Sequence, residues 1–245
     1  MIVIRPEDSI HRSWLYRLLI EILDNKKLAA NLFFKGGTCA TMLGFLDRLS
    51  LDLDFDLKNG ADKKMVRKEL EKTFVVLELK VKDESTKWLQ YILKYGDWEN
   101  KRNSLKLEIV GEELKNNDHK SLYLADIDRY AICQTIETMF ANKLVAVVDR
   151  FEKHGLIAGR DIYDIAYFFR QGFSFKKEVI EERRGMDYKK YLEYLIDFVD
   201  KKITDTVLVQ DLGMLISSEK LRQVRKSLKS EMMMYLREEV LKNKQ

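Results

Sequence analysis

Two groups of residues in the first quarter of the chain have the types and spacing that phosphate chemistry requires. In the first, Lys35-Gly36-Gly37-Thr38, two glycines stand where a short apolar run gives way to a helical pattern. Glycines at that point let the backbone approach a ligand, and the free N–H groups of a helix start favour phosphate oxygens. The turn therefore predicts a phosphate-binding site, to which the Thr38 hydroxyl would add a donor.

The second group lies on a strictly alternating segment, residues 51–57, which predicts a half-buried strand. Asp52 and Asp54 leave the same face of such a strand with their Cα atoms about 7 Å apart. Two carboxylates this close repel unless a cation lies between them, and carboxylates beside a phosphate-binding turn are typical of Mg²⁺ sites. The two groups together predict metal-assisted phosphoryl or nucleotidyl transfer.

Each feature alone has a plainer explanation. A Gly-Gly pair is commonly only a turn, and an alternating acidic strand is commonly a solvated sheet face. The combination is more specific, because a glycine turn, one short helix and then a strand carrying Asp-x-Asp is the layout of a nucleotidyltransferase palm.

The surrounding elements are predicted from periodicity. In the N-terminal half, helices are expected over 9–28, 38–43 and 61–74, and strands over 31–34, 51–57, 75–81, 88–95 and 104–110. From about Asp126 onward long helical periods cover 132–151, 159–171, 188–202 and 218–242. These patterns predict an α+β fold: a mixed-sheet palm over residues 1–125, followed by a helical bundle over 126–245 that completes the active site.

Composition excludes several other classes of protein. Of the 245 residues, 44 are Lys or Arg and 40 are Asp or Glu, and this net charge of +4 permits a polyanionic partner without requiring one. Charge interrupts every apolar stretch before the ~20 residues of a membrane span, so we expect a cytoplasmic protein without a membrane partner. Cys39 and Cys133 lack metal-site spacing, and the three histidines are scattered, so zinc and triad chemistry are not expected.

Three ordered blocks of the sequence resemble the AbiEii family of nucleotidyltransferase toxins, members of the DNA polymerase β-like superfamily. The first runs from Phe34-Lys35-Gly36-Gly37-Thr38 to Arg48-Leu49-Ser50-Leu51-Asp52-Leu53-Asp54-Phe55. The others are residues 137–144 with Asp149-Arg150, and Arg160-Asp161-Ile162-Tyr163-Asp164-Ile165. The resemblance implies transfer of a nucleoside monophosphate from an NTP to an acceptor, which for some members is the 3′ end of a transfer RNA. It also implies a role in toxin–antitoxin or abortive-infection systems, beside a cognate antitoxin.

Residue by residue, the resemblance places Gly36, Gly37 and Thr38 on the triphosphate and Asp52 and Asp54 on two metal ions. Three further residues in matching positions are expected to contact phosphate or support the turn: Lys35, Arg48 and Ser50.

Such enzymes use a third acid on a neighbouring strand, and the alternating segment 104–110 puts Glu108 on its polar face. We expect Glu108 to share a metal and to help deprotonate the attacking hydroxyl. Lys143 and Asp161 match family positions linked to nucleotide handling. For Asp164 and Arg150 a structural salt-bridge network is an equally good interpretation.

A basic stripe near the C-terminus suggests an RNA contact. Arg222, Arg225, Lys226 and Lys229 recur at helical spacing, which fits either a solvated helix face or a track for the phosphate backbone of RNA. The sequence thus predicts a Mg²⁺-dependent nucleotidyltransferase acting on RNA. A nucleotidyltransferase for a small molecule such as an aminoglycoside, and a non-catalytic nucleotide- or antitoxin-binding module, remain as alternatives.

Overall fold

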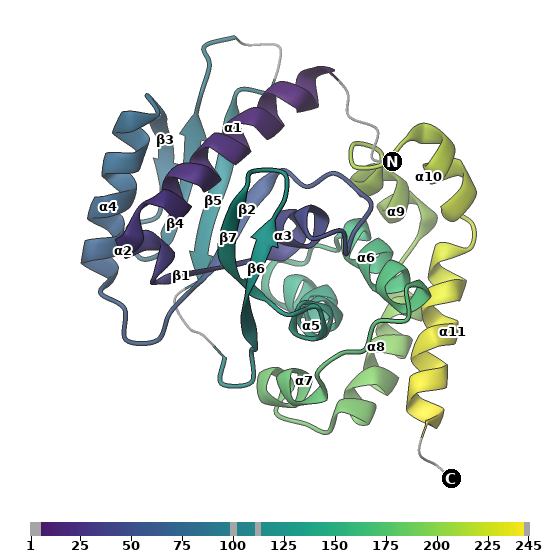
Figure 1. Cartoon of the computed structure of the whole chain (residues 1–245). Coiled ribbons are helices and arrows are strands. Elements are labelled where there is room, and N and C mark those ends of the chain that lie inside the picture. Colours follow the sequence, from purple (N-terminus) through teal and green to yellow (C-terminus); the bar gives the residue numbers. More distant parts are fainter. Residues whose placement is uncertain (1–5, 99–101, 111–113, 243–245) are drawn as a thin grey trace. The chain divides into compact units, whose positions relative to one another are not determined.

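The structure of the chain is a computed structural model that describes residues 6–98, 102–110 and 114–242 (Figure 1). The chain divides into two compact units. The first extends to Thr135 and contains every strand of the described chain, whereas the second begins at Ile136 and is helical. The α+β class predicted from the sequence is confirmed.

A seven-stranded mixed sheet forms the centre of the first unit (Figure 1), in the order β3-β4-β5-β2-β1-β7-β6. The strands are β1 Leu32–Lys35, β2 Asp52–Leu57, β3 Lys80–Glu84, β4 Leu89–Lys94, β5 Ser104–Val110, β6 His119–Leu124 and β7 Arg129–Gln134. β2 pairs parallel to β5 and antiparallel to β1, which pairs parallel to β7. The acidic strand β2 therefore lies in the middle of the sheet, with neighbours on both sides.

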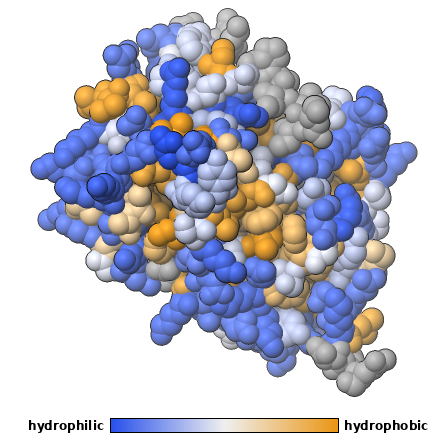
Figure 2. Space-filling model, in the orientation of Figure 1, coloured by the Kyte–Doolittle hydropathy of each residue, from blue (hydrophilic) through white to orange (hydrophobic). Residues whose placement is uncertain are grey.

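The alternation of β2 and β5 gives the sheet one apolar face. Leu53, Phe55, Leu105 and Leu107 are fully buried, as expected for side chains that alternate with the polar ones. Helices α1 (Pro6–Asp24) and α4 (Lys63–Val76) pack along the sheet (Figure 1), α1 against β2, β5 and β7, and α4 against β3. The outer surface of α4 is mainly hydrophilic in Figure 2, which is typical of an amphipathic helix.

Two shorter helices complete the first unit. α2 (Lys26–Ala29) leads into β1, and α3 (Gly36–Met42) follows β1 directly and contacts both β1 and β2. Because no loop separates β1 from α3, the position of the glycine pair is fixed by the central strands of the sheet.

The second unit is a helical bundle. Its helices are α5 Ile136–His154, α6 Gly159–Arg170, α7 Lys177–Arg184, α8 Tyr188–Lys202, α9 Asp205–Leu212, α10 Ser218–Val224 and α11 Leu228–Leu241. α6 packs against α5, α9 and α11, and α8 packs against α7 and α11. Leu144, Ile165, Leu195 and Leu236 are fully buried between them. Among the described residues no helix is long and apolar enough to cross a membrane.

The structure corrects the expected domain boundary. The units divide after Thr135 rather than near residue 125, because β6 and β7 form a hairpin that belongs to the sheet. The helix expected over 132–151 is in fact the end of β7 followed by α5, with Thr135 between them. The turn of the hairpin contains Asp128 at φ +52° rather than a glycine, so the usual sequence signal of a hairpin is missing.

Candidate active site

The glycine turn and the acidic strand are in direct contact. Gly36 has a φ of +78°, and a β-carbon added to it would lie 2.3 Å from Oδ2 of Asp54. A β-carbon on Gly37 would lie 2.7 Å from Oγ of Ser50 and 3.1 Å from Nη2 of Arg48. Gly36 is therefore required both for its backbone conformation and for the space that Asp54 occupies.

Three carboxylates come together beside this turn. Asp52 and Asp54 lie on one face of β2, and Glu108 is the register partner of Asp54 on the adjacent parallel strand β5. Neighbouring strands are about 4.8 Å apart, so Glu108 and Asp54 are side by side on the same face. The structure thus brings the three acids singled out from the sequence into one cluster.

Within the cluster, the carboxyl of Asp54 has a raised pKa. Burial and the negative charges of Asp52 and Glu108 raise the pKa of this carboxyl, Lys35 and Lys106 oppose the shift, and the resulting pKa is about 6. Asp54 therefore lies in a site where additional positive charge would be favourable.

The third aspartate of β2 has a different environment. Asp56 is buried, and its carboxylate accepts hydrogen bonds from Lys35 Nζ at 2.6 Å and Gln134 Nε2 at 2.6 Å, with His119 Nε2 at 3.3 Å. Burial would raise the pKa of Asp56, but these partners together lower it. Asp56 is a satisfied structural carboxylate, and Lys35 is held by it.

Two other residues expected at the phosphates are used inside the protein. The buried Thr38 hydroxyl donates to the backbone carbonyl of Asp52 and so ties α3 to β2. The buried Arg48 donates through Nη1 to the carbonyl of Leu49 at 2.8 Å, and its carbonyl accepts from the Thr41 hydroxyl at 3.0 Å. Thr38 and Arg48 therefore support the turn. The backbone of Gly36 and Gly37 remains the candidate for phosphate contact.

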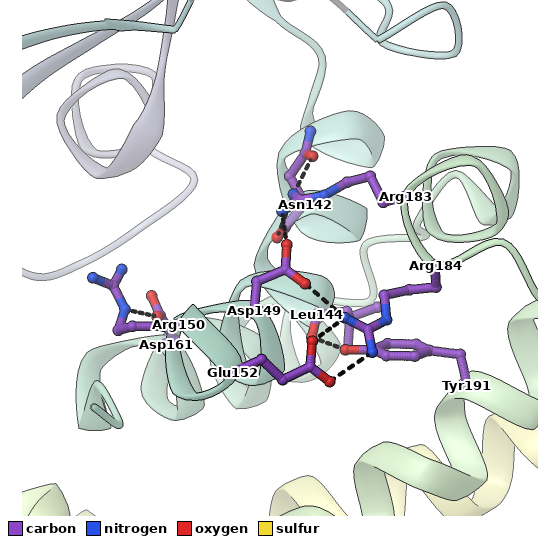
Figure 3. Close-up of polar contacts among 9 residues, drawn as sticks. All are labelled: Asn142, Leu144, Asp149, Arg150, Glu152, Asp161, Arg183, Arg184 and Tyr191. Carbon is purple, nitrogen blue, oxygen red and sulfur yellow. Dashed lines mark hydrogen bonds and ion pairs between the residues drawn. The ribbon is translucent and has the colours of Figure 1, made fainter. Parts of the chain in front are cut away.

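In the second unit, Lys143 and Asp161 are part of one buried ion cluster. Lys143 Nζ lies 2.9 Å from Oδ1 of Asp161 and 3.0 Å from Oδ2 of Asp164. Arg150 Nε lies 3.4 Å from the other oxygen of Asp161 (Figure 3). Both aspartates have no exposed surface. Burial would raise the pKa of Asp161, but Lys143 and Arg150 outweigh it and lower the pKa.

A clamp between α5 and α7 was not predicted from the sequence. Arg183 donates to Asp149 Oδ2 at 2.5 Å and to Asn142 Oδ1 at 2.7 Å. Figure 3 shows how Arg183 faces these two side chains of α5. Arg184 also reaches Asp149, at 2.7 Å, and forms a two-bond pair with Glu152. The clamp holds the stretch of α5 that carries Lys143 and Arg150. Its only sequence signal is an Arg-Arg pair, which is uninformative without knowledge of the partner helix.

The basic stripe is not continuous. α10 ends at Val224, and Arg225 and Lys226 fall in the turn before α11, so the helix expected over 218–242 is two helices. Lys229 Nζ donates to the carbonyls of Asp200 at 2.7 Å and Ile203 at 3.1 Å. Lys229 thus joins α11 to the end of α8, and the stripe is reduced to Arg222, Arg225 and Lys226.

No group of three His, Cys, Asp or Glu side chains is arranged to hold a metal ion in the part of the chain that the structure describes. In the acidic cluster, the Glu108 carboxylate is instead paired with the ammonium of Lys106.

Comparison with solved structures supports the fold. JHP933 from Helicobacter pylori superposes with a TM-score of 0.59 at 18% identity, over 96% of this chain and 94% of that one. MenT4, a nucleotidyltransferase toxin from Mycobacterium tuberculosis, superposes with a TM-score of 0.54 at 15% identity, over 95% of this chain and 86% of that one. A search of curated protein sequences finds no match.

The family assignment rests on the sequence model described as nucleotidyl transferase AbiEii toxin, type IV toxin–antitoxin system, which matches residues 17–241. This range includes the glycine turn, the acidic strand and the buried ion cluster of the second unit. The chain is a nucleotidyltransferase that belongs to the AbiEii toxin family.

Proposed function

We propose that the protein is a Mg²⁺-dependent enzyme that transfers a nucleoside monophosphate from an NTP to an RNA acceptor, most specifically the 3′ end of a transfer RNA. The observation that carries the proposal is the contact between Gly36 and Asp54. It holds a phosphate-type turn and a pair of carboxylates within one short stretch of the first unit.

The donor set fits a hard divalent cation. Asp52, Asp54 and Glu108 offer only carboxylate oxygens, which Mg²⁺ prefers. The pKa of Asp54 is raised by burial and by the negative charges of Asp52 and Glu108, and a bound cation would offset both effects. We assign Asp52 and Asp54 as metal ligands, with Glu108 as the third acid. Bound there together with the triphosphate, Mg²⁺ would supply charge stabilisation at the reacting phosphate.

The remaining roles follow from the chemistry of nucleotidyl transfer. The backbone N–H groups of Gly36 and Gly37 bind phosphate oxygens of the NTP. The acceptor hydroxyl attacks the α-phosphorus, the bond to the leaving pyrophosphate breaks, and Glu108 accepts the hydroxyl proton. Lys143 and Asp161 take part in nucleotide handling, in keeping with their place in the blocks that resemble the family.

The choice of RNA as acceptor is supported by the family and by charge. The family is one of toxins of type IV toxin–antitoxin systems, so we also propose a cognate antitoxin. The net charge of +4 permits a polyanionic partner, and Arg222, Arg225 and Lys226 are the candidate contacts for its phosphates.

A single labelling experiment tests these proposals. The full-length protein is incubated with each α-labelled NTP and Mg²⁺, with total RNA, transfer RNA or a panel of aminoglycosides as acceptor. Label on transfer RNA supports the proposal, label on an aminoglycoside replaces the acceptor class, and nucleotide binding without any transfer contradicts catalysis. Asp54→Asn serves as the control for a contaminating activity.

A further inference from the structure

The acidic cluster contains one cation that the family resemblance does not assign. Lys106 lies on β5 as the register partner of Asp52, two residues before Glu108. Residues i and i+2 of a strand share a face, so Lys106 lies on the same face as all three acids. Its ammonium forms an ion pair with Oε2 of Glu108, and the two side chains are only 33% and 35% exposed.

Two other lysines of this face, further from the acids, have exposed partners, whereas Lys35, the register partner of Asp54, is paired with the buried Asp56. Lys94 on β4 pairs with Asp97 at 2.7 Å, and Lys80 on β3 pairs with the same aspartate at 3.5 Å. Asp97 is 71% exposed, so these are ordinary surface ion pairs of small energetic value. Lys106 differs from Lys94 and Lys80 because its partner is the candidate third acid, and because its charge also acts on Asp54.

We propose that Lys106 is a positioning residue, an internal counter-ion that holds Glu108 and compensates the acidic cluster until a divalent cation and the nucleotide bind. This inference rests on the proposed function, since it requires Asp52 and Asp54 to be metal ligands. With a cation held by Asp52 and Asp54, Glu108 would be shared with the metal, and the ammonium of Lys106 would then be available to a phosphate oxygen as a mobile point charge.

The proposal predicts opposite effects on two binding reactions. In Lys106→Met a competing positive charge is removed, so we expect Mn²⁺ alone to bind about threefold to tenfold more tightly, as for a unit charge acting over several ångströms in a screened site. A non-hydrolysable NTP analogue with saturating Mn²⁺ should bind about tenfold more weakly, because one phosphate contact of roughly 1.4 kcal/mol is lost. A variant that merely misfolded would weaken both reactions.

The experiment measures both affinities by calorimetry on the full-length chain. Lys106→Arg keeps the charge and should keep the wild-type affinity for Mn²⁺, and the matched control Lys94→Met should leave both affinities unchanged. Unchanged or weaker binding of Mn²⁺ by Lys106→Met would overturn the role of Lys106 and leave the metal site standing. Failure of the wild-type protein to bind Mn²⁺ would overturn the metal site itself, and this proposal with it.

Discussion

The carboxylate of Asp54 occupies the space that a side chain on Gly36 would need, 2.3 Å from the position of its β-carbon. The glycine turn and the acidic strand are therefore coupled, because a larger side chain at Gly36 would displace the Asp54 carboxylate. The consequences can be measured residue by residue.

Gly36→Ala should reduce nucleotidyl transfer by about 100-fold or more, because an added methyl group pushes the Asp54 carboxylate away and shifts the glycine turn that we propose binds the triphosphate. The change also places a side chain at positive φ, which costs about 1 kcal/mol. Gly60→Ala is the matched control, since Gly60 has the same φ of +78° but nothing within 4 Å of its added β-carbon. Equal loss of activity in the two variants would show that backbone strain alone is responsible.

Asp54→Asn should abolish transfer while leaving the free energy of unfolding unchanged or higher, because it removes a repelled charge from the cluster. Asp56→Asn should instead lower the free energy of unfolding by about 2 to 4 kcal/mol, because the Lys35 ammonium then loses a buried ionic partner. Urea denaturation and the labelling assay on both variants check this. A destabilised Asp54→Asn with full activity would contradict the division of roles along β2.

Lys143→Met should destabilise the second unit by about 3 to 5 kcal/mol, because two fully buried aspartates lose a shared counter-ion. The matched control is Lys201→Met, whose ion pair with Asp197 is more than half exposed and worth no more than about 1 kcal/mol. Denaturation of both variants decides the matter. Similar denaturation midpoints for the two variants would mean that other groups neutralise the charges of Asp161 and Asp164.

Acid should weaken the same cluster in a defined direction. The pKa of Asp161 is lowered in the folded state, so its contribution to stability is complete above the ordinary aspartate pKa of about 3.9. That contribution is lost as the pH falls through the lower, folded-state value. Asp161→Asn should therefore flatten the fall in unfolding free energy as the pH drops below about 4, whereas the surface change Asp197→Asn should not. An equally steep fall in Asp161→Asn would exclude this group as the origin.

The three remaining cations of the basic stripe test the RNA acceptor. If Arg222, Arg225 and Lys226 contact phosphates, replacing all three with Gln should lower the slope of log affinity against log salt by about 0.7 to 0.9 per lost contact. Affinity for NTP should not change. Lys229→Gln is a contrasting variant, expected to destabilise α11 because Lys229 caps the carbonyls of Asp200 and Ile203. Identical salt slopes for the wild type and the triple variant would make the stripe an ordinary solvated surface.

Local patterns were enough to predict the elements that carry the acids. The segments 104–110 and 188–202 coincide with β5 and α8, and 51–57 differs from β2 by one residue. In each case the hydrophobic period matches the side-chain period of the element. The hairpin β6–β7 was missed because its turn has no glycine and because β7 runs into α5 across Thr135 alone. The break between α10 and α11 was missed for a similar reason, since Arg225-Lys226-Ser227 contains neither glycine nor proline.

Contacts between segments that are distant in the chain could not be predicted from the sequence. The pairing of Asp56 with His119 and Gln134 requires the order of strands, and the Arg183 and Arg184 clamp requires the packing of α7 on α5. The sequence predicted that the Thr38 hydroxyl would donate to phosphate, because its actual acceptor, the Asp52 carbonyl, is brought close only by the packing of α3 on β2. Residue types predicted which side chains could do chemistry, and tertiary packing determines which of them already form hydrogen bonds or ion pairs within the protein.

The parallel pairing of β2 with β5 has a consequence for folding. β2 ends at Leu57 and β5 begins at Ser104, so their pairing must close over α4, β3 and β4 before it gains any contact. Such non-local pairing is slow to form, because the entropy of loop closure is lost first. The pairing of β1 with β2 closes only over residues 36–51, a much shorter segment, and already includes the glycines, Asp52 and Asp54. A chain still being synthesised can therefore form the glycine turn and the two aspartates of the proposed site early, and Glu108 and Lys106 join them together when β5 pairs with β2.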